Sequence, residues 1–158
     1  EVIGAERPAV IIELGTWAGG FTCLLGIAAR NYGLQLHSFG HDEINPRSVP
    51  WFAHLAGTLT FHRCDVFAED TLRTFKALYT GGKVLALCDN GSKPREFALL
   101  APMLRPGDII ACHDIGGEYW DCCEMTEADI AAPCATYGLE PYMPDQAYRA
   151  GWLAKRKA

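Results

Sequence analysis

The sequence lacks the long apolar and strongly basic segments that would tie a protein to a membrane or to nucleic acid. No uninterrupted apolar run approaches the roughly 20 residues that a membrane-spanning helix needs. The pattern of a secretory signal peptide, a basic segment followed by an apolar one, is also missing, and we expect a cytoplasmic protein. The formal net charge of −5 argues against general binding to nucleic acid or to anionic membranes.

The seven cysteines lack the spacing of a disulfide scaffold, a zinc site or a thioredoxin-like motif. Their number is odd, no CxxC pair occurs, and several of them fall inside apolar segments. Buried thiols of this kind behave as small hydrophobic side chains. The pattern therefore favours free cysteines in a reducing compartment.

What the sequence does contain is a repeated order of apolar strand, turn and helix, with no internal repeat and no domain boundary. Strands are predicted at 9–14, 34–39, 58–66, 83–88 and 108–112, and helices at 21–31, 46–57, 70–79 and 94–104. Two further strands, 137–143 and 148–155, are predicted to pair in antiparallel fashion across a turn at 144–145. Residues 1–158 are therefore expected to form one three-layer α/β/α domain with a mostly parallel sheet.

Acidic residues follow the ends of the five predicted parallel strands. In such a sheet, ligands bind beyond the carboxyl ends of the strands, near the point where the strand order reverses. Any one of these acids could merely cap a helix, but together they converge on one edge of the sheet. These acids predict a functional site at that edge of the sheet. The acids are Glu13, Asp42 with Glu43, Asp65, Asp89 and Asp114.

The sharpest local signal is the segment E-L-G-T-W-A-G-G at residues 13–20. Its glycines allow a ligand to approach the backbone and supply unusual dihedral angles. It is not the dinucleotide fingerprint GxGxxG, because Trp17 stands two residues after Gly15. The carboxylate of Glu13 would repel a pyrophosphate and suits a ligand with a cationic or hydroxyl-rich part. The alternative interpretation is a plain tight turn that Glu13 caps.

This segment resembles the E-[IL]-G-x-x-x-G-x-[ST] motif of the class I S-adenosylmethionine-dependent methyltransferases, within their metal-dependent O-methyltransferase branch. The residues that carry the resemblance are Glu13, Gly15, Gly19 or Gly20, and Thr22. The sequences D-N-G-S at 89–92 and H-D at 113–114 are similar to the cephalosporin hydroxylase and macrocin O-methyltransferase group. The resemblance extends over about 10–155 and implies a Rossmann-like methyltransferase fold that ends in an antiparallel strand pair.

The resemblance implies contacts for each part of S-adenosylmethionine. The turn would hold the methionine part through Glu13, Gly15, Thr16, Trp17, Gly19 and Gly20, with Asp89 nearby. An acid after the second strand would accept hydrogen bonds from both ribose hydroxyls. The usual position for this acid is Gly40 here, so we assign the role to Asp42, with Glu43 as the alternative. Asp65 and the backbone of Val66 would meet the adenine, unless Asp65 only caps a helix.

In the same branch, residues after the fourth and fifth strands bind a divalent cation. Asp89, His113 and Asp114 take these positions, and two carboxylates with water suit Mg²⁺. His113 stands where an acid is more usual, so it either shifts the preference towards manganese, iron or zinc or is no ligand. In the alternative interpretation, both acids only cap loops.

Two residues are candidates for the base that removes the proton of an acceptor hydroxyl. Lys93 is one residue away from the place of the catalytic lysine in catechol-type enzymes, and a surface lysine is the alternative. His113 is the second candidate. Trp17 and the pair Tyr119-Trp120 could line an acceptor pocket beside a hinge at Gly116-Gly117, whereas Trp51 is expected in the core.

The expected function is S-adenosylmethionine-dependent methylation of a hydroxyl on a small molecule. In one form of this hypothesis, a divalent metal assists the reaction. We expect no nucleic-acid or membrane partner, and the sequence leaves a homo-oligomer open. Because the chain is short for the branch, the alternative is a non-catalytic or fragmentary Rossmann-like binding domain. An NAD-linked oxidoreductase is less favoured, because GxGxxG is missing and no second domain follows.

Overall fold

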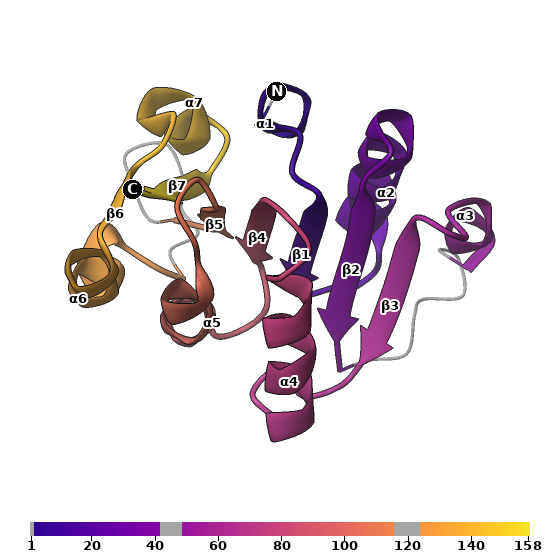
Figure 1. Cartoon of the computed structure of the whole chain (residues 1–158), viewed down its shortest axis with the longest axis horizontal. Helices are drawn as coiled ribbons and strands as arrows, with labels where there is room; N and C mark the ends of the chain where they lie inside the picture. The colour runs from indigo at the N-terminus through magenta and orange to yellow at the C-terminus, as the bar shows by residue number, and fades with distance from the viewer. Residues whose placement is uncertain (1, 42–48, 116–123) are drawn as a thin grey trace.

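Within the residues that the computed structural model describes, 2–41, 49–115 and 124–158, seven strands form one sheet in the order β3-β2-β1-β4-β5-β7-β6 (Figure 1). Five neighbouring strands are parallel: β1 (Val10–Leu14), β2 (Gln35–Gly40), β3 (Leu59–Arg63), β4 (Val84–Cys88) and β5 (Ile109–His113). Strand β7 (Trp152–Lys157) runs antiparallel to β5 and to β6 (Leu139–Pro141). The predicted α/β class and mostly parallel sheet are confirmed.

Helices cover both faces of the sheet (Figure 1). Helices α4 (Glu69–Leu78), α5 (Lys93–Leu100) and α6 (Glu127–Tyr137) pack on one face, and α1 (Val2–Glu6), α2 (Gly20–Tyr32) and α7 (Pro144–Arg149) on the other. The short helix α3 (Val49–His54) precedes β3, and a 3-10 turn, η1 (Ala101–Met103), follows α5. Strands β1 and β4 are buried along their whole length, which explains their continuous apolar sequences.

The region after β5 differs most from the sequence prediction. Helix α6 was not predicted, although its capping box is visible in the sequence: the Thr126 hydroxyl and backbone N–H both bond to Asp129 Oδ2, at 2.8 and 2.7 Å. Residues 144–149 form helix α7 rather than a turn, because Pro144 suits the first position of a helix. The antiparallel pair is real but shorter than predicted, since Tyr137 ends α6.

Two smaller predictions about helices are wrong. The helix predicted at 94–104 leaves the α conformation after Leu100, where Pro102 introduces the tighter turn η1. Trp51, expected in the core, is 59% exposed on α3, and Leu55 is the residue that is buried. Leu55 packs so closely against α2 that a Cβ atom on Gly26 would lie 2.3 Å from Leu55 Cδ1.

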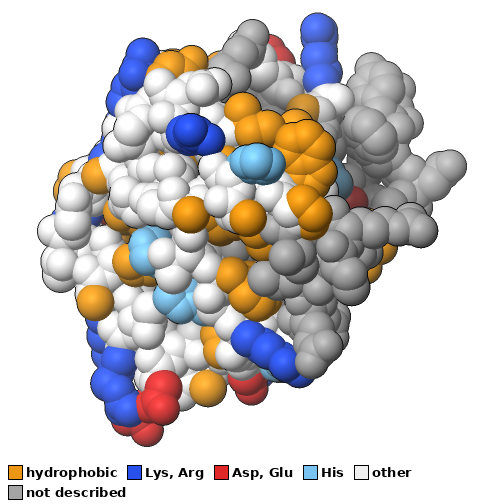
Figure 2. All heavy atoms as spheres, turned by 90° about the vertical axis from the view of Figure 1, so that its right-hand side faces the viewer, with side chains coloured by type: hydrophobic (Ala, Val, Ile, Leu, Met, Phe, Trp, Pro, Cys, Tyr) orange, Lys and Arg blue, Asp and Glu red, His pale blue; other side chains and the backbone are white. Residues whose placement is uncertain are grey.

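The face at the β3 edge shows no dense cluster of basic side chains among its described residues. On the face that the β3 edge presents, lysine and arginine side chains stand apart from one another, with histidines among mostly uncharged atoms (Figure 2). No helix in the described part of the chain is long and apolar enough to cross a membrane. The described cysteines, Cys23, Cys64, Cys88, Cys112 and Cys134, are free thiols, as the sequence predicted for them.

Candidate functional site

A cleft of about 740 Å³ lies at the carboxyl edge of the sheet, above the point where β1 and β4 are neighbours. The chain crosses over in opposite directions from these two strands, so the helices that follow diverge and leave space between them. Predicted site residues line much of this cleft, namely Gly15, Thr16, Trp17, Gly20, Asp89, Lys93, His113 and Asp114. The expected convergence of strand ends on one site therefore holds for β1, β4 and β5.

The turn after β1 is held against the turn after β4 by contacts that only glycine permits. Gly15 has a φ of +105°, and a Cβ atom there would lie 2.3 Å from the carbonyl oxygen of Asp89. The Asp89 N–H donates to the Leu14 carbonyl at 2.8 Å, which fixes the same junction. Trp17 adopts a left-handed conformation, with a φ of +42°, and its side chain is 85% exposed beside the cleft.

Glu13 lies beneath this turn and has no exposed surface. Its Oε2 accepts hydrogen bonds from Ser38 Oγ at 2.6 Å and from Thr22 Oγ1 at 2.8 Å. Ser38 also bonds to Thr16 at 2.6 Å, while Glu13 Oε1 is buried without a hydrogen-bond partner among the described residues. Burial raises the pKa of Glu13 to about 7, although the two hydroxyl donors oppose this shift. Glu13 therefore supports the turn from below and does not line the cleft.

Charged side chains from β4, β5 and α5 meet at the other wall of the cleft. His113 Nδ1 lies 3.5 Å from Asp89 Oδ1 and 3.0 Å from Asp114 Oδ1. Lys93 Nζ lies 3.7 Å from Asp89 Oδ1, 3.2 Å from Asp114 Oδ2 and 2.5 Å from Glu124 Oε2. One ligand atom each from Asp89, His113 and Asp114 can be chosen so that all three lie within 4.8 Å of one another. We call the five residues Asp89, Lys93, His113, Asp114 and Glu124 the charged cluster.

Lys93 is 3% exposed, so the alternative interpretation of a surface lysine is wrong. It begins α5 and is drawn inward by the carboxylates around it. Burial lowers the pKa of Lys93, but the hydrogen bonds to Glu124 and Asp114 outweigh this effect and raise the pKa above its usual value. Burial also raises the pKa of Asp89. Lys93 is therefore a cation at neutral pH and a poor acceptor of a proton.

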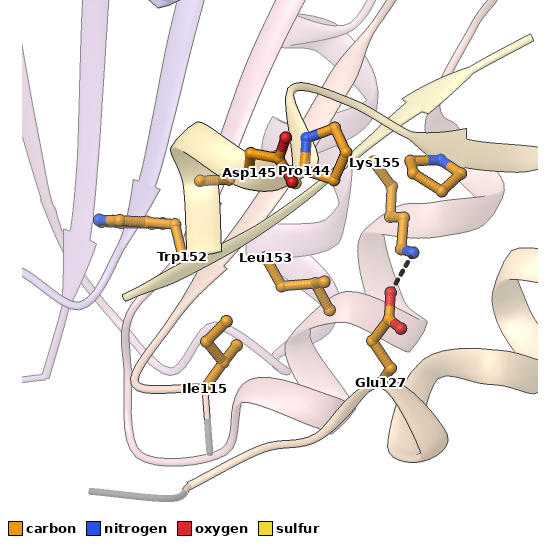
Figure 3. A pocket seen from close by; sticks show the side chains of 10 residues that line it. Ile115, Glu127, Pro144, Asp145, Trp152, Leu153 and Lys155 are labelled. Carbon is orange, nitrogen blue, oxygen red and sulfur yellow. Dashed lines mark hydrogen bonds and ion pairs between the residues drawn. The ribbon is translucent and has the colours of Figure 1, made fainter. Parts of the chain in front are cut away.

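Trp152 forms an aromatic wall next to the charged cluster. Strand β7 pairs Trp152 with His113, and the two rings lie 4.8 Å apart. The Phe21 ring lies 5.5 Å from Trp152 on the other side. Trp152 also borders a second cavity of about 420 Å³, where Lys155 donates to Glu127 at 2.7 Å (Figure 3). Trp152 therefore stands between the cleft and this second cavity, and its ring lines both.

Some predicted cofactor contacts lie elsewhere. Val66 is fully buried. Asp65 Oδ1 accepts from the Phe67 backbone N–H at 2.8 Å, which closes a turn ahead of α4, and the N-cap of that helix is Ala68 and not Asp65. Asp65 approaches the cleft only through His41, whose Nε2 lies 3.9 Å away. Gly19 is the N-cap that precedes α2, has a φ of +80° and does not line the cleft. Asp42, Glu43, Gly116, Gly117, Tyr119 and Trp120 lie outside the described residues.

Several residues that line the cleft were not predicted as site residues from the sequence: Phe21, Gly40, His41, Phe61, Glu124 and Trp152. Gly40 could have been found, because it is the position at which the family usually has its ribose-binding acid. A Cβ atom there would lie 3.0 Å from Thr16 Oγ1, so the close approach of this turn favours glycine. Trp152 and Glu124 reach the site through long-range pairing with His113 and Asp114, and no local pattern reveals such pairing.

The strand order, the glycine turn over β1 and the cleft at the switch point define a Rossmann-like cofactor-binding domain of the methyltransferase type. A family described as a methyltransferase domain matches residues 12–115, and the chain belongs to this family. No curated protein matches the sequence.

Solved structures share the fold at low sequence identity. An O-methyltransferase family protein from Burkholderia thailandensis has a TM-score of 0.62 and 12% identity, over 96% of this chain and 52% of that chain. Podospora anserina methyltransferase PaMTH1, bound to S-adenosylhomocysteine, has a TM-score of 0.64 and 12% identity, over 99% of this chain and 75% of that chain. A structure of cmcI with magnesium and S-adenosylmethionine has a TM-score of 0.68 and 18% identity, over 99% of this chain and 68% of that chain.

The chain spans about half the length of the Burkholderia protein. The fold is that of the class I S-adenosylmethionine-dependent methyltransferases, as the resemblance predicted.

Proposed function

We propose that this chain is an S-adenosylmethionine-dependent O-methyltransferase that acts on a hydroxyl group of a small molecule. The observation that carries the proposal is the junction of Gly15 and Asp89, which joins the glycine turn to the charged cluster in one cleft. The turn offers backbone groups to a cofactor, and the cluster offers charged groups to an acceptor a short distance away. Both are needed for methyl transfer, because the sulfonium carbon and the hydroxyl oxygen must be held in line.

The cofactor would lie along the cleft from the turn after β1 towards the end of β2. Gly15, Thr16 and Gly20 supply the wall for its methionine part. Gly40, His41 and Phe61 line the opposite end, where the adenosyl part would lie. Glu13 would act as a positioning residue, because it holds the turn through Thr22 and through Ser38, which also bonds to Thr16.

The charged cluster fits a divalent cation by the chemistry of its donors. Asp89 and Asp114 offer carboxylate oxygens and His113 offers a ring nitrogen within the spacing that one ion spans. With neutral His113, the three carboxylates and one ammonium of the cluster leave a net charge of −2, which a divalent cation would neutralise. Such an ion would lower the pKa of an acceptor hydroxyl and orient its oxygen.

The residues of this chain supply the remaining needs of the reaction. The acceptor oxygen forms a bond to the methyl carbon as the carbon–sulfur bond breaks, and the hydroxyl proton must leave. In the version of the proposal in which the cation is held by Asp89 and Asp114 alone, His113 is the proton acceptor, because Lys93 is already paired with carboxylates. Trp152 and Phe21 would exclude water from the side of the cleft next to His113.

Calorimetric titration with S-adenosylhomocysteine, repeated with Mg²⁺ and with the chelator EDTA, tests this function. We expect micromolar binding of S-adenosylhomocysteine and no binding of NAD measured in parallel. Asp114→Asn should remove binding of Mg²⁺ and leave S-adenosylhomocysteine bound, because Asp114 belongs to the metal side of the cleft. Asp145→Asn changes an exposed acid on α7 and serves as the control. Absence of S-adenosylhomocysteine binding would contradict the proposal and favour a non-catalytic domain.

A further inference from the structure

Lys93 occupies the centre of the charged cluster rather than its margin. Its side chain is 3% exposed, and lysine is almost never buried to this degree unless it is paired. Its ammonium lies between oxygens of Glu124, Asp114 and Asp89, and it also donates to the Asn90 carbonyl at 3.3 Å. The side chain thus satisfies three carboxylates that come from three different segments of the chain.

The oxygens that face Lys93 belong to the same carboxylates that would hold a divalent cation. Asp114 directs Oδ2 to Lys93 and Oδ1 to His113, while Asp89 Oδ1 lies near both residues. A cation bound by Asp89 and Asp114 would therefore lie within a few ångströms of a second positive charge. Two such charges repel one another strongly where protein and not water surrounds them.

We propose that Lys93 is a tethered counter-ion that competes with a divalent cation for Asp89 and Asp114. The inference rests on the metal site of the proposed function. Without the metal, the ammonium holds the carboxylates together. When the metal binds, the ammonium withdraws from Asp89 and Asp114 and remains on Glu124, the partner to which it is already closest, at 2.5 Å. Lys93 is therefore a positioning residue that sets the affinity for the ion.

Glu124 is placed so that it can keep Lys93 after this exchange. Its backbone N–H donates to the Asp114 carbonyl at 3.0 Å, and the next residue, Met125, forms a β-bridge with Ile115. These contacts fix the backbone of Glu124 beside the site. Its side chain is 48% exposed, so it can follow the ammonium outward without breaking buried contacts.

Titration of the whole chain with Mn²⁺, followed by calorimetry, tests the competition. Lys93→Met should bind Mn²⁺ with a Kd lower by about tenfold or more, because a positive charge next to the ion is lost. Glu124→Gln should raise the Kd by about threefold or more, because Lys93 then turns fully to Asp89 and Asp114. The two variants change the Kd in opposite directions. General damage to the fold would raise the Kd in both.

The chain offers a matched control for each variant. Lys155 is a second buried lysine that bonds to a surface glutamate, Glu127, at 2.7 Å, and it lies outside the cluster (Figure 3). Lys155→Met and Glu127→Gln should leave the Kd for Mn²⁺ within about twofold of the parent value. Affinity for S-adenosylhomocysteine and the circular dichroism spectrum report whether each variant is folded.

The double variant Lys93→Met/Glu124→Gln separates competition from direct ligation. If Glu124 acts through Lys93, its loss has little effect on the Kd for Mn²⁺ once Lys93 is gone. Suppose that the parent protein binds Mn²⁺ at Asp89 and Asp114. An unchanged or higher Kd in Lys93→Met would then overturn the counter-ion role of Lys93 but not the metal site. If neither the parent protein nor Lys93→Met binds Mn²⁺, the metal site of the proposed function is overturned, and the competition is overturned with it. Binding by Lys93→Met only would support the counter-ion most strongly.

Discussion

At the scale of single residues, Glu13 has a buried carboxyl group that is only partly hydrogen-bonded. It is buried with one oxygen hydrogen-bonded to Ser38 and Thr22 and the other without a partner among the described residues. Burial raises its pKa to about 7, compared with about 4.5 for an ordinary glutamate. Between these two pH values the folded protein keeps the carboxyl protonated, whereas the unfolded chain loses the proton. The contribution of Glu13 to stability therefore falls as the pH rises from about 4.5 to about 7.

The variant Glu13→Gln should remove this dependence, because glutamine keeps an acceptor for Thr22 and Ser38 but cannot ionise. We expect the free energy of unfolding of the parent protein, relative to the variant, to fall by about 3 kcal/mol between pH 4.5 and pH 7.5. Urea unfolding of both proteins over this range measures the difference. Burial lowers the pKa of His37 and His62, which acts in the opposite direction, but both proteins contain them and their effect cancels. Parallel pH curves for the two proteins would contradict the assignment.

The sequence predicted which of several residues meet in the cleft better than it predicted their burial and their bonding partners. Asp89, His113 and Asp114 were expected together because neighbouring parallel strands must end at the same edge. The burial of Lys93 was not expected, because it depends on Glu124, which lies 31 positions away in the sequence. Asp65 illustrates the reverse case, since its hydrogen bond to Phe67 could be expected from the tendency of aspartate to accept from the backbone N–H two residues further on.

At the scale of elements, the contact between the turns after β1 and β4 decides whether a cleft forms. Gly15 touches the backbone of Asp89 and Asn90, and backbone atoms cannot move aside as flexible side chains do. The positive φ of Gly15 adds a second reason for glycine.

Gly15→Ala should lower the free energy of unfolding by about 3 kcal/mol or more and abolish S-adenosylhomocysteine binding. The reason is that the new methyl group would lie 2.3 Å from the Asp89 carbonyl oxygen, which separates the two turns. Gly20→Ala is the matched control for stability, because a Cβ atom there meets nothing within 4 Å and alanine favours helix α2. Equal stability of the two variants would show that the turns do not need their close contact.

Element prediction succeeded where periodicity was strong and failed where capping decided the structure. The parallel strands are continuous apolar runs, and their positions were correct to within a few residues. Helix α6 has weak apolar periodicity and α7 is only six residues long, so the cap residue Thr126 and the first residue Pro144 were the better signals. Trp51 was misplaced because an apolar residue at helical spacing was taken as core, although α3 is only six residues long.

At the scale of the whole molecule, the family match and the parallel strands of the sheet cover nearly the same part of the chain. Residues 12–115, which match the methyltransferase family, contain strands β2 to β5 and all of β1 except Val10 and Ile11. The same sheet architecture also serves dinucleotide-binding proteins, so fold alone does not separate the two. The turn at 13–20 and the charged cluster make the distinction, and ligand-induced stabilisation can test it.

S-adenosylhomocysteine at about 100 times its Kd should raise the melting temperature by roughly 5–10 °C, because ligand binding to the folded state alone adds about 2.7 kcal/mol. NAD at the same concentration should leave the melting temperature unchanged. Differential scanning calorimetry measures both, and Gly15→Ala should show no shift with either ligand. A larger shift with NAD than with S-adenosylhomocysteine would overturn the assignment of the cofactor.

The register of β7 against β5 has a consequence for how this protein is made. Trp152 reaches His113 only after β7 inserts beside β5, although the turn at 13–20 and the strands β1 to β5 precede it in synthesis. A nascent chain on the ribosome can therefore assemble the parallel sheet while one wall of the cleft is still missing. Chains stalled before residue 152 would expose the flank of β5 as an unpaired edge, which favours recognition by chaperones or premature association with other chains. The cleft would then be completed in one late step.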